Sequence, residues 1–368
     1  MKVFDPYDIW ACPSLGRLKH RWYQGDKSAG IVLRLVALLD ALAPVPLRRM
    51  LGVDKHDFAH VEAMLLPLTL EKKNSVVSKF RSMLTSSGGW GLPFDWYSKN
   101  GVYDANTPYV TNTPYVMEAL LSLAETPELH EEAMALFHGT WGFLESLKIM
   151  HGDANMLALS YAPVDEPRKV VNANAYAAFA YGLHAVHGRE SIRDQAREKA
   201  TRLACWVTRQ QKEDGGWFYY ADNEPGNFID GFHSCFIVKN LLKMVRLLPE
   251  TQSLVDESIA RGWAFIQENL LDKEAGLCRR FVQRSHRDPY KWDLYDQAEF
   301  LGLLVDFKRY EEAGAFATRV EQKFRKGNHW YCRIDIFGRR WGRDFLRWGI
   351  APFLYHRARL QVAVKGSC

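Results

Sequence analysis

Residues 172–186 (NANAYAAFAYGLHAV) and 230–244 (DGFHSCFIVKNLLKM) share the pattern that decides the fold, a polar start followed by a long stretch of apolar, small and aromatic residues. The pattern begins again near residues 111, 293 and 344, so it recurs about every 60 residues. A helix that is apolar on nearly all sides is buried on nearly all sides. These five segments therefore predict an inner ring of helices.

Four segments between the inner ones are amphipathic instead. They cover residues 131–148, 192–211, 252–269 and 310–325, with charged residues along one face. Such helices lie against a core and expose their polar face to water. Two helices in each repeat fit helical hairpins that bury a core by closing on themselves. The sequence predicts an all-α toroid of the (α/α)6 type, a barrel of helical hairpins with few or no β-strands.

Helical patterns also occur near the N-terminus, at residues 30–43, 58–67 and 71–85. The last inner helix, near residue 344, has no outer helix after it, so we expect the N-terminal helices to supply the missing hairpin. On this view residues 1–86 form a helical segment that contributes to the barrel and residues 87–368 form the toroid. We expect one compact domain.

Composition narrows the class of protein. The chain has 368 residues, of which 47% are hydrophobic, enough for a large core. Its net charge of +5 is spread without a dense basic block, so nucleic acid is not an expected partner, whereas an anionic ligand or an anionic membrane surface stays open. No apolar run matches the roughly 20 residues of a membrane span, and the first residues lack the apolar core of a signal peptide. We expect a cytoplasmic protein.

The motifs for metals and cofactors are missing from the sequence. The six cysteines contain no C-x-x-C pair, and there is neither a phosphate-binding loop nor a dinucleotide fingerprint. Asp230, His233 and Cys235 are near each other, but on a helix they do not all face one way, as a zinc site would need. The sequence predicts no metal and no cofactor.

If all inner helices point the same way, their N-termini and the preceding loops meet at one rim of the barrel. Aromatic residues are concentrated there: Trp90, Phe94, Trp96, Tyr161, Trp217, Tyr219, Tyr220, Tyr290, Trp292, Trp330, Tyr331, Trp341 and Trp348. Flat rings in a polar cleft can stack on sugar rings; alternatively, they only pin long loops to the barrel. We expect the largest cavity at this rim, lined by Tyr161, Asn174, Trp217, Asp230, His233 and Arg347.

Polar residues also mark the helix starts: Thr111, Asn112, Asn172, Asn174, Asp230, His233, Asp293, Asp296, Gln297, Arg343, Asp344 and Arg347. Thr111, Asn172, Asp230 and Asp344 are expected to be N-caps. Capping does not explain the imidazole of His233 inside a buried helix, or the permanent charge of Arg347. These two residues are the strongest functional candidates.

Two resemblances follow from motifs. Residues 211–217 (QKEDGGW) are similar to the Q-x-x-D-G-x-W motif of terpene cyclases, which staples the hairpins of a toroid. The acidic clusters that those cyclases need for catalysis are missing, because no two aspartates are adjacent in this chain. This resemblance concerns the architecture only.

The second resemblance runs from end to end of the chain. It rests on eight motifs in order: residues 5–8 (DPYD), 46–52 (PLRRMLG), 91–96 (GLPFDW), 160–163 (SYAP), 172–174 (NAN), 214–217 (DGGW), 229–234 (IDGFHS) and 347–349 (RWG). Together they resemble the VpsJ-type bacterial polysaccharide-biosynthesis proteins. The resemblance implies a role in making exopolysaccharide or lipopolysaccharide, in the cytoplasm or peripherally at the inner membrane.

Three functions stay open. The first is an enzyme that moves a proton on an acidic sugar unit, as a uronate C5-epimerase or a lyase does, with His233 as base, Tyr161 or Tyr219 as acid and Arg347 holding the carboxylate. The second is a glycoside hydrolase that uses Asp230 with Asp293 or Asp296. The third is a glycan-binding or assembly protein without catalysis.

The expected partner is an acidic sugar or a glycan linked to a lipid or a nucleotide, and the oligomeric state is left open. The residues expected to bind this substrate are Trp90, Trp96, Asn172, Asn174, Trp217, Asp293, Asp296, Arg347 and Trp348.

Overall fold

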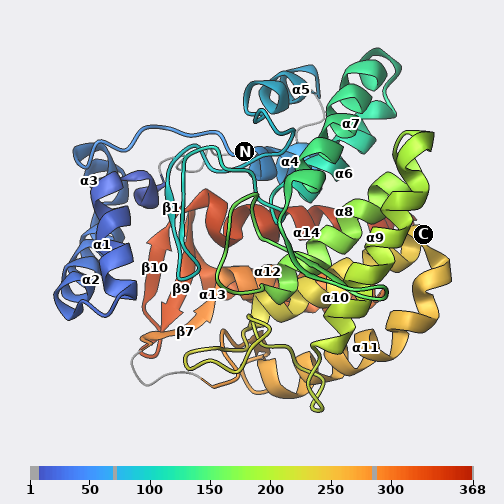
Figure 1. Ribbon diagram of the computed structural model, residues 1–368. Helices are drawn as coiled ribbons and strands as arrows, with labels where there is room; N and C mark the ends of the chain where they lie inside the picture. Colours follow the sequence, from blue (N-terminus) through green and yellow to red (C-terminus); the bar gives the residue numbers. More distant parts are fainter. Residues whose placement is uncertain (1–7, 69–72, 284–287, 367–368) are drawn as a thin grey trace.

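The computed structural model describes residues 8–68, 73–283 and 288–366 and has the (α/α)6 toroid fold (Figure 1). Within this part of the chain six helices form a closed inner ring, because each packs against the next and the last packs against the first. They are α4 (Ala59–Leu65), α6 (Thr113–Ala124), α8 (Val171–His187), α10 (Gly231–Leu247), α12 (Leu294–Asp306) and α14 (Ala351–Gly366). The predicted all-α toroid is confirmed.

An outer layer of helices surrounds this ring. It consists of α5 (Lys73–Ser82), α7 (His130–Ser146), α9 (Glu190–Arg209), α11 (Gln252–Phe265) and α13 (Tyr310–Phe324). The four amphipathic segments predicted from the sequence correspond to α7, α9, α11 and α13. Of the segment predicted at residues 71–85, positions 71 and 72 lie outside the described residues, and α5 covers the middle of the rest.

The N-terminal helices divide into two groups. Whereas α4 and α5 join the barrel, α1 (Pro13–Tyr23), α2 (Lys27–Leu42) and α3 (Pro44–Met50) lie outside it, at the left of Figure 1. These three helices have a small apolar core of their own, formed by Ile9, Cys12, Leu15, Leu47 and Val53. The helix predicted at residues 30–43 exists as α2, but it is α4 that packs against α14 and closes the ring.

Short strands were not expected in such number. Two-stranded antiparallel hairpins join the helices: β1 (Trp96–Tyr97) with β2 (Val102–Tyr103), β3 (Ile149–Gly152) with β4 (Leu157–Leu159), and β5 (Leu271–Asp272) with β6 (Leu277–Cys278). An antiparallel sheet contains β7 (Tyr290–Asp293), β9 (His329–Asp335) and β10 (Arg340–Arg343), and β8 (Arg325–Lys326) pairs with β9 as well. Along β9 the side chains of Trp330, Cys332 and Ile334 are buried in alternation, which is the period of a half-buried strand. The sequence predicts a loop here instead of a strand.

The starts of the inner helices confirm one predicted cap and correct three other predictions. Asp230 caps α10 as predicted, because its side chain accepts from the backbone of the first turn. Thr111 and Asn172 are not caps: Thr111 bonds the hydroxyl of Tyr161, and Asn172 lies inside α8. The helix predicted to begin at Asp344 begins at residue 351, because Gly349 has φ +88° and breaks the helical path.

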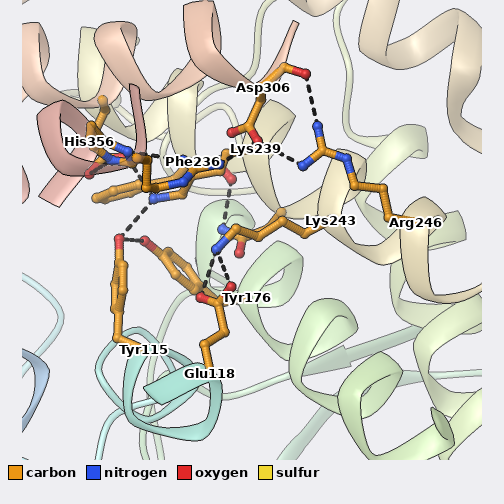
Figure 2. Close-up of polar contacts among 12 residues, drawn as sticks. Tyr115, Glu118, Tyr176, Phe236, Lys239, Lys243, Arg246, Asp306 and His356 are labelled. Carbon is orange, nitrogen blue, oxygen red and sulfur yellow. Dashed lines mark hydrogen bonds and ion pairs between the residues drawn. The ribbon is translucent and has the colours of Figure 1, made fainter. Parts of the chain in front are cut away.

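Buried polar and charged side chains lie inside the ring (Figure 2). Lys239 Nζ donates to Glu299 Oε2 at 2.6 Å and to the hydroxyl of Tyr115 at 2.8 Å, and Tyr176 continues this chain at 2.8 Å from Tyr115. Lys239 and Glu299 are both fully buried. Lys239 and His356 lower the pKa of Glu299 to about 2 against the opposing effect of burial, so the carboxylate stays ionised.

A second layer of ion pairs follows toward the C-terminal ends of the inner helices. Lys243 donates to both oxygens of Glu118 at 2.7 Å. Arg246 and Arg359 both donate to Asp306 Oδ1, at 2.8 and 2.7 Å, and their charges hold the pKa of Asp306 well below its usual value despite burial. Each of these cations therefore has a carboxylate partner.

Over the described residues, no helix has the length and apolar character needed to cross a membrane. The same part of the chain contains no cluster of three His, Cys, Asp or Glu residues with the geometry of a metal site.

Candidate functional site

The first turn of α10 brings a histidine and a carboxylate together. Asp230 accepts a hydrogen bond from the backbone N–H of His233 at 3.2 Å, and its two oxygens lie 2.9 and 2.7 Å from His233 Nδ1. An ionised carboxylate only accepts, so Nδ1 carries a proton and Nε2 is left as the basic nitrogen of the ring. Nε2 has no partner among the described residues, and the His233 side chain is 19% exposed. Asp230 thus orients the imidazole and caps the helix as well.

Aromatic rings surround this histidine. The ring centroids of Phe232 and Tyr219 lie 4.0 and 4.5 Å from that of His233, and Phe228 stacks on Tyr219 at 5.0 Å with an interplanar angle of 11°. Burial raises the pKa of Tyr219 well above its usual value, so its phenol is neutral. The imidazole therefore lies at the edge of an apolar, aromatic wall.

Tyr161 belongs to the same rim and comes from the loop after β4. Its hydroxyl lies 2.7 Å from Thr111 Oγ1, and burial raises its pKa to about 12. After burial, the charge of Tyr161 contributes most to raising the pKa of Tyr219. At neutral pH Tyr161 keeps its proton.

Asp293 anchors the neighbouring part of the rim. It caps α12 by accepting from the backbone of Tyr295, and its oxygens also accept from Trp348 Nε1 and from Arg333 Nε, each at 3.0 Å. Arg280 lies 3.4 Å away, and Asp293 is 1% exposed. Its charge is therefore fully engaged in holding Trp348 and two arginines.

Asp296, one turn further along α12, is a different carboxyl group. It is fully buried, its Oδ1 accepts from the backbone N–H of Phe232 at 2.8 Å, and its Oδ2 has no partner among the described residues. Burial, with the charges of Asp293 and Asp230 added, raises its pKa well above the usual value. Burial and the two neighbouring carboxylates thus favour the protonated form of Asp296.

Arg347 lies just before the kink that precedes α14. Its Nε donates to Asp8 Oδ2 at 2.6 Å, and its guanidinium lies 5.2 Å from the ring centre of Trp96. The residue is 9% exposed, yet Nη2 is buried without a partner in the described part of the chain. Arg347 Nη2 is thus a hydrogen-bond donor that is shielded from water and has no acceptor among the described residues.

Lys19 of α1 lies beside this arginine. Its Nζ is 3.7 Å from the ring centre of Trp96 and 4.7 Å from that of Trp10, and it makes no ion pair or hydrogen bond with any described residue. Burial, followed by the charge of Arg347, lowers its pKa to about 7. Asp8 is the carboxylate near both Lys19 and Arg347, so two basic side chains share one negative charge.

The histidine pair and the cation pair lie at the same end of the barrel. Phe232, which precedes His233, has its ring 5.8 Å from that of Trp348, which follows Arg347. The rim thus combines the imidazole of His233, neutral phenols and an aromatic wall. Lys19 and Arg347 add a positively charged part of the rim, the cationic corner.

Four residues predicted to bind substrate are built into the core instead. Trp90 is 0% exposed and donates its indole N–H to the carbonyl of Phe80. Trp217 is 2% exposed and donates to Val207, as expected for the staple motif rather than for a sugar platform. Asn172 and Asn174 are 2% and 0% exposed, and Asn174 bonds the backbone of β4. These four side chains offer no surface to a ligand in this structure.

Two pockets in the described part of the chain do not match the predicted cavity. One, of ≈ 520 Å³, is lined by residues 148–150, 165–169, 221, 222 and 224, beside Tyr161. The other, of ≈ 430 Å³, lies at the opposite end of the barrel, around Asp306 and Arg359. Neither pocket is lined by the six residues expected. Asn174, Trp217 and Asp230 are at most 4% exposed. Arg347 is covered by Asp8 and Trp96.

Sequence reasoning missed Asp8, Lys19 and Arg333 as members of the rim. Asp8 and Arg347 are 339 positions apart, so no local pattern joins them. The DPYD motif did mark Asp8, although residues 5–7 of that motif lie outside the described residues. Nothing in the sequence around Lys19 distinguishes it from the surface lysines.

Comparison with known proteins supports the fold. No family model matches the chain, and no curated protein matches it in sequence. Among solved structures it is similar to a sugar epimerase from a ruminal bacterium, with a TM-score of 0.61, 14% identity, and coverage of 86% of this chain and 90% of that one. It is also similar to a D-mannose isomerase, with a TM-score of 0.60, 14% identity, and coverage of 83% of this chain and 86% of that one. A glycoside hydrolase of family 105 from C. acetobutylicum is similar as well, with a TM-score of 0.57, 11% identity, and coverage of 83% of this chain and 92% of that one. These neighbours are carbohydrate-active toroid enzymes, and the similarity establishes the toroid architecture.

Proposed function

We propose that the protein is a carbohydrate-processing enzyme that transfers a proton on an acidic sugar unit, as a uronate C5-epimerase or a lyase does. The observation that carries this proposal is the His233–Asp230 pair. A buried carboxylate that fixes the proton on Nδ1 leaves Nε2 free to accept a proton, which is what abstraction of a proton next to a carboxylate requires.

The cationic corner fits the other half of such a reaction. When the base removes the proton next to the substrate carboxylate, the electron pair moves onto that carboxylate and its negative charge grows. The free Nη2 of Arg347 and the unpaired ammonium of Lys19 are donors suited to hold that charge. We assign the anionic group of the substrate to this corner.

The proton that completes an epimerisation comes from the other face of the sugar. Tyr161 is protonated at neutral pH because its pKa is about 12, and Tyr219 is likewise neutral. We assign Tyr161 as the donor, since Tyr219 already lies against the imidazole. Donation leaves a tyrosinate and an imidazolium, which return to their starting forms by exchanging one proton through solvent.

The experiment that tests the proposal is incubation in deuterated water with uronic acids linked to a nucleotide or a lipid. Deuterium at C5, detected by mass spectrometry and NMR, is the expected result, and His233→Ala removes it. His187→Ala is the matched control, because that histidine is exposed at the far end of α8. Release of a reducing end with neither deuterium at C5 nor the unsaturated sugar that a lyase leaves would replace the proposal by hydrolysis.

The hydrolase alternative has less support from the geometry. It needs two carboxyl groups that face the sugar on either side of the bond. Asp293 is engaged by two arginines and an indole, and Asp296 is fully buried against the backbone of Phe232. A protein that only binds glycans is supported by the aromatic wall but leaves the oriented imidazole unexplained.

The biological setting rests on the resemblance to the VpsJ-type proteins. On that basis we place the reaction in the synthesis of a surface polysaccharide, on a glycan carried by a lipid or a nucleotide. Loss of exopolysaccharide or lipopolysaccharide in a deletion strain, restored by the wild-type gene and not by the His233→Ala variant, is the corresponding test in cells.

A further inference from the structure

The outward face of α2 is apolar along its whole length. Ile31, Leu35, Leu38 and Leu42, spaced four, three and four residues apart, are 59%, 56%, 45% and 69% exposed. Val32 and Leu39 widen this stripe, and Trp22 and Met50 expose further apolar surface on α1 and α3: these eight residues are the α2 patch. Soluble monomers rarely expose so many large aliphatic side chains together, so the α2 patch marks a contact surface.

The α2 patch lies in a basic segment of the chain. Residues 9–50 contain seven lysines and arginines but two acidic residues, which gives this segment a net charge of +5. Both acidic residues are already paired, Asp26 with Arg21 and Asp40 with the buried Arg48. Lys27 and Arg34 are exposed on α2 itself and border the stripe.

We propose that the α2 patch docks on the surface of an anionic lipid bilayer, with α2 lying in the plane of the membrane. A helix that presents an apolar face bordered by basic residues buries that face at the headgroup boundary, while the cations contact anionic headgroups. The proposal stands apart from the reaction assigned above, because no residue of the α2 patch belongs to the rim site.

Charge favours a bilayer over a second copy of the chain. Pairing two copies through this face would bring together two segments that each carry a net charge of +5. A bilayer containing phosphatidylglycerol supplies the opposite charge and an apolar layer together. The spacing of Ile31, Leu35, Leu38 and Leu42 would also suit a helix pair, so the test includes the oligomeric state.

The geometry gives the docking a clear orientation. In Figure 1 α1, α2 and α3 lie on one side of the barrel, and α1 packs against both α2 and β1. The same helix carries Lys19 over Trp96 at the rim. The helix that we dock on the membrane therefore packs directly against the helix that carries Lys19.

The test is co-sedimentation of the full chain with vesicles of phosphatidylglycerol and phosphatidylcholine, compared with vesicles of phosphatidylcholine alone. We expect binding to the anionic vesicles, weakened at least about tenfold by the double variant Leu35→Glu/Leu42→Glu. Lys27→Glu/Arg34→Glu is expected to remove the preference for anionic lipid. Ile149→Glu is the matched control, because Ile149 is an apolar residue on β3 that is 71% exposed and outside the α2 patch.

Two results would overturn the inference. One is equal vesicle binding by wild type and Leu35→Glu/Leu42→Glu, with both variants folded by circular dichroism. The other is a wild-type dimer in light scattering that the same double variant converts to a monomer, together with no binding to either kind of vesicle. That outcome would assign the α2 patch to a second copy of the chain. Deuterium exchange in solution on nucleotide-linked sugars is independent of all these outcomes.

Discussion

Two regions of the barrel bury charged groups, and they treat them differently. In the interior of the ring every cation has a carboxylate partner, as Lys239 has Glu299 and Arg359 has Asp306. At the rim Lys19 has none, Arg347 keeps a buried donor free, and His233 presents an unbonded nitrogen. Burial alone therefore does not distinguish the two regions, whereas incomplete pairing does.

The largest expected effect comes from the rim. His233→Ala should lower turnover on an acidic sugar by roughly 10²–10⁴-fold while the melting temperature stays nearly unchanged, because the imidazole bonds only to Asp230. Steady-state kinetics and thermal melts measure the two quantities. A folded variant with full activity would remove histidine from the mechanism and leave the rim as a binding surface.

The interior should respond in the opposite way. Glu299→Ala leaves the ammonium of Lys239 buried without its carboxylate. The free energy of unfolding, measured by urea denaturation, should therefore fall by about 3–5 kcal/mol. The double variant Lys239→Met/Glu299→Leu removes both charges and should recover most of that loss. If the single and the double variants were equally destabilised, the interior pair would not be the source of the effect.

Lys19 provides a test through pH. Its folded pKa of about 7 lies below the usual 10.5, so between these values the unfolded chain binds a proton that the folded chain does not. The unfolding free energy should therefore rise with pH across this window, by on the order of 3 kcal/mol, and Lys19→Met should flatten the rise. The charged groups facing Lys19 are Arg347, Arg333 and Asp8, and burial raises the pKa of the neighbouring Tyr23 to about 12. An identical pH profile in the variant would contradict the unpaired state of Lys19.

The smallest expected effect concerns Trp348. Trp348→Phe keeps the ring but removes the hydrogen bonds to Asp293, which should cost about 1 kcal/mol of unfolding free energy. If Trp348 is also a platform for sugar, binding of the acidic sugar weakens a few-fold in the same variant. Calorimetric binding at matched temperature separates the two effects, since a purely structural tryptophan changes only stability.

How far the sequence predicts this molecule depends on the range of the interactions. The inner and outer helices were predictable because periodicity is local, and the cap at Asp230 was predictable because a polar residue directly precedes an apolar run. The start of α14 was not, since the kink at Gly349 depends on its close approach to Leu294. The cationic corner was only half visible: Arg347 was recognised as a buried charge, whereas Lys19 and Asp8 reach it from the other end of the chain.

The roles of the rim residues predicted from sequence stay predictions. The structure groups His233, Asp230, Tyr161, Tyr219, Arg347 and Trp348 at one end of the barrel. It assigns Trp90, Trp217, Asn172 and Asn174 to the core. The residues in the core differ from the rim residues because their buried indoles and amides form hydrogen bonds with the backbone. Such partners cannot be predicted from the sequence.

The closure of the ring by α14 on α4 has a consequence for how the chain is made. During synthesis α4, at residues 59–65, leaves the ribosome long before α14, at residues 351–366. Until the last helix emerges, the nascent chain is an open arc whose two ends expose the apolar flanks of α4 and α12. Contacts between such distant segments form late, so ribosome-bound chains that end before residue 351 should be the species most in need of chaperones.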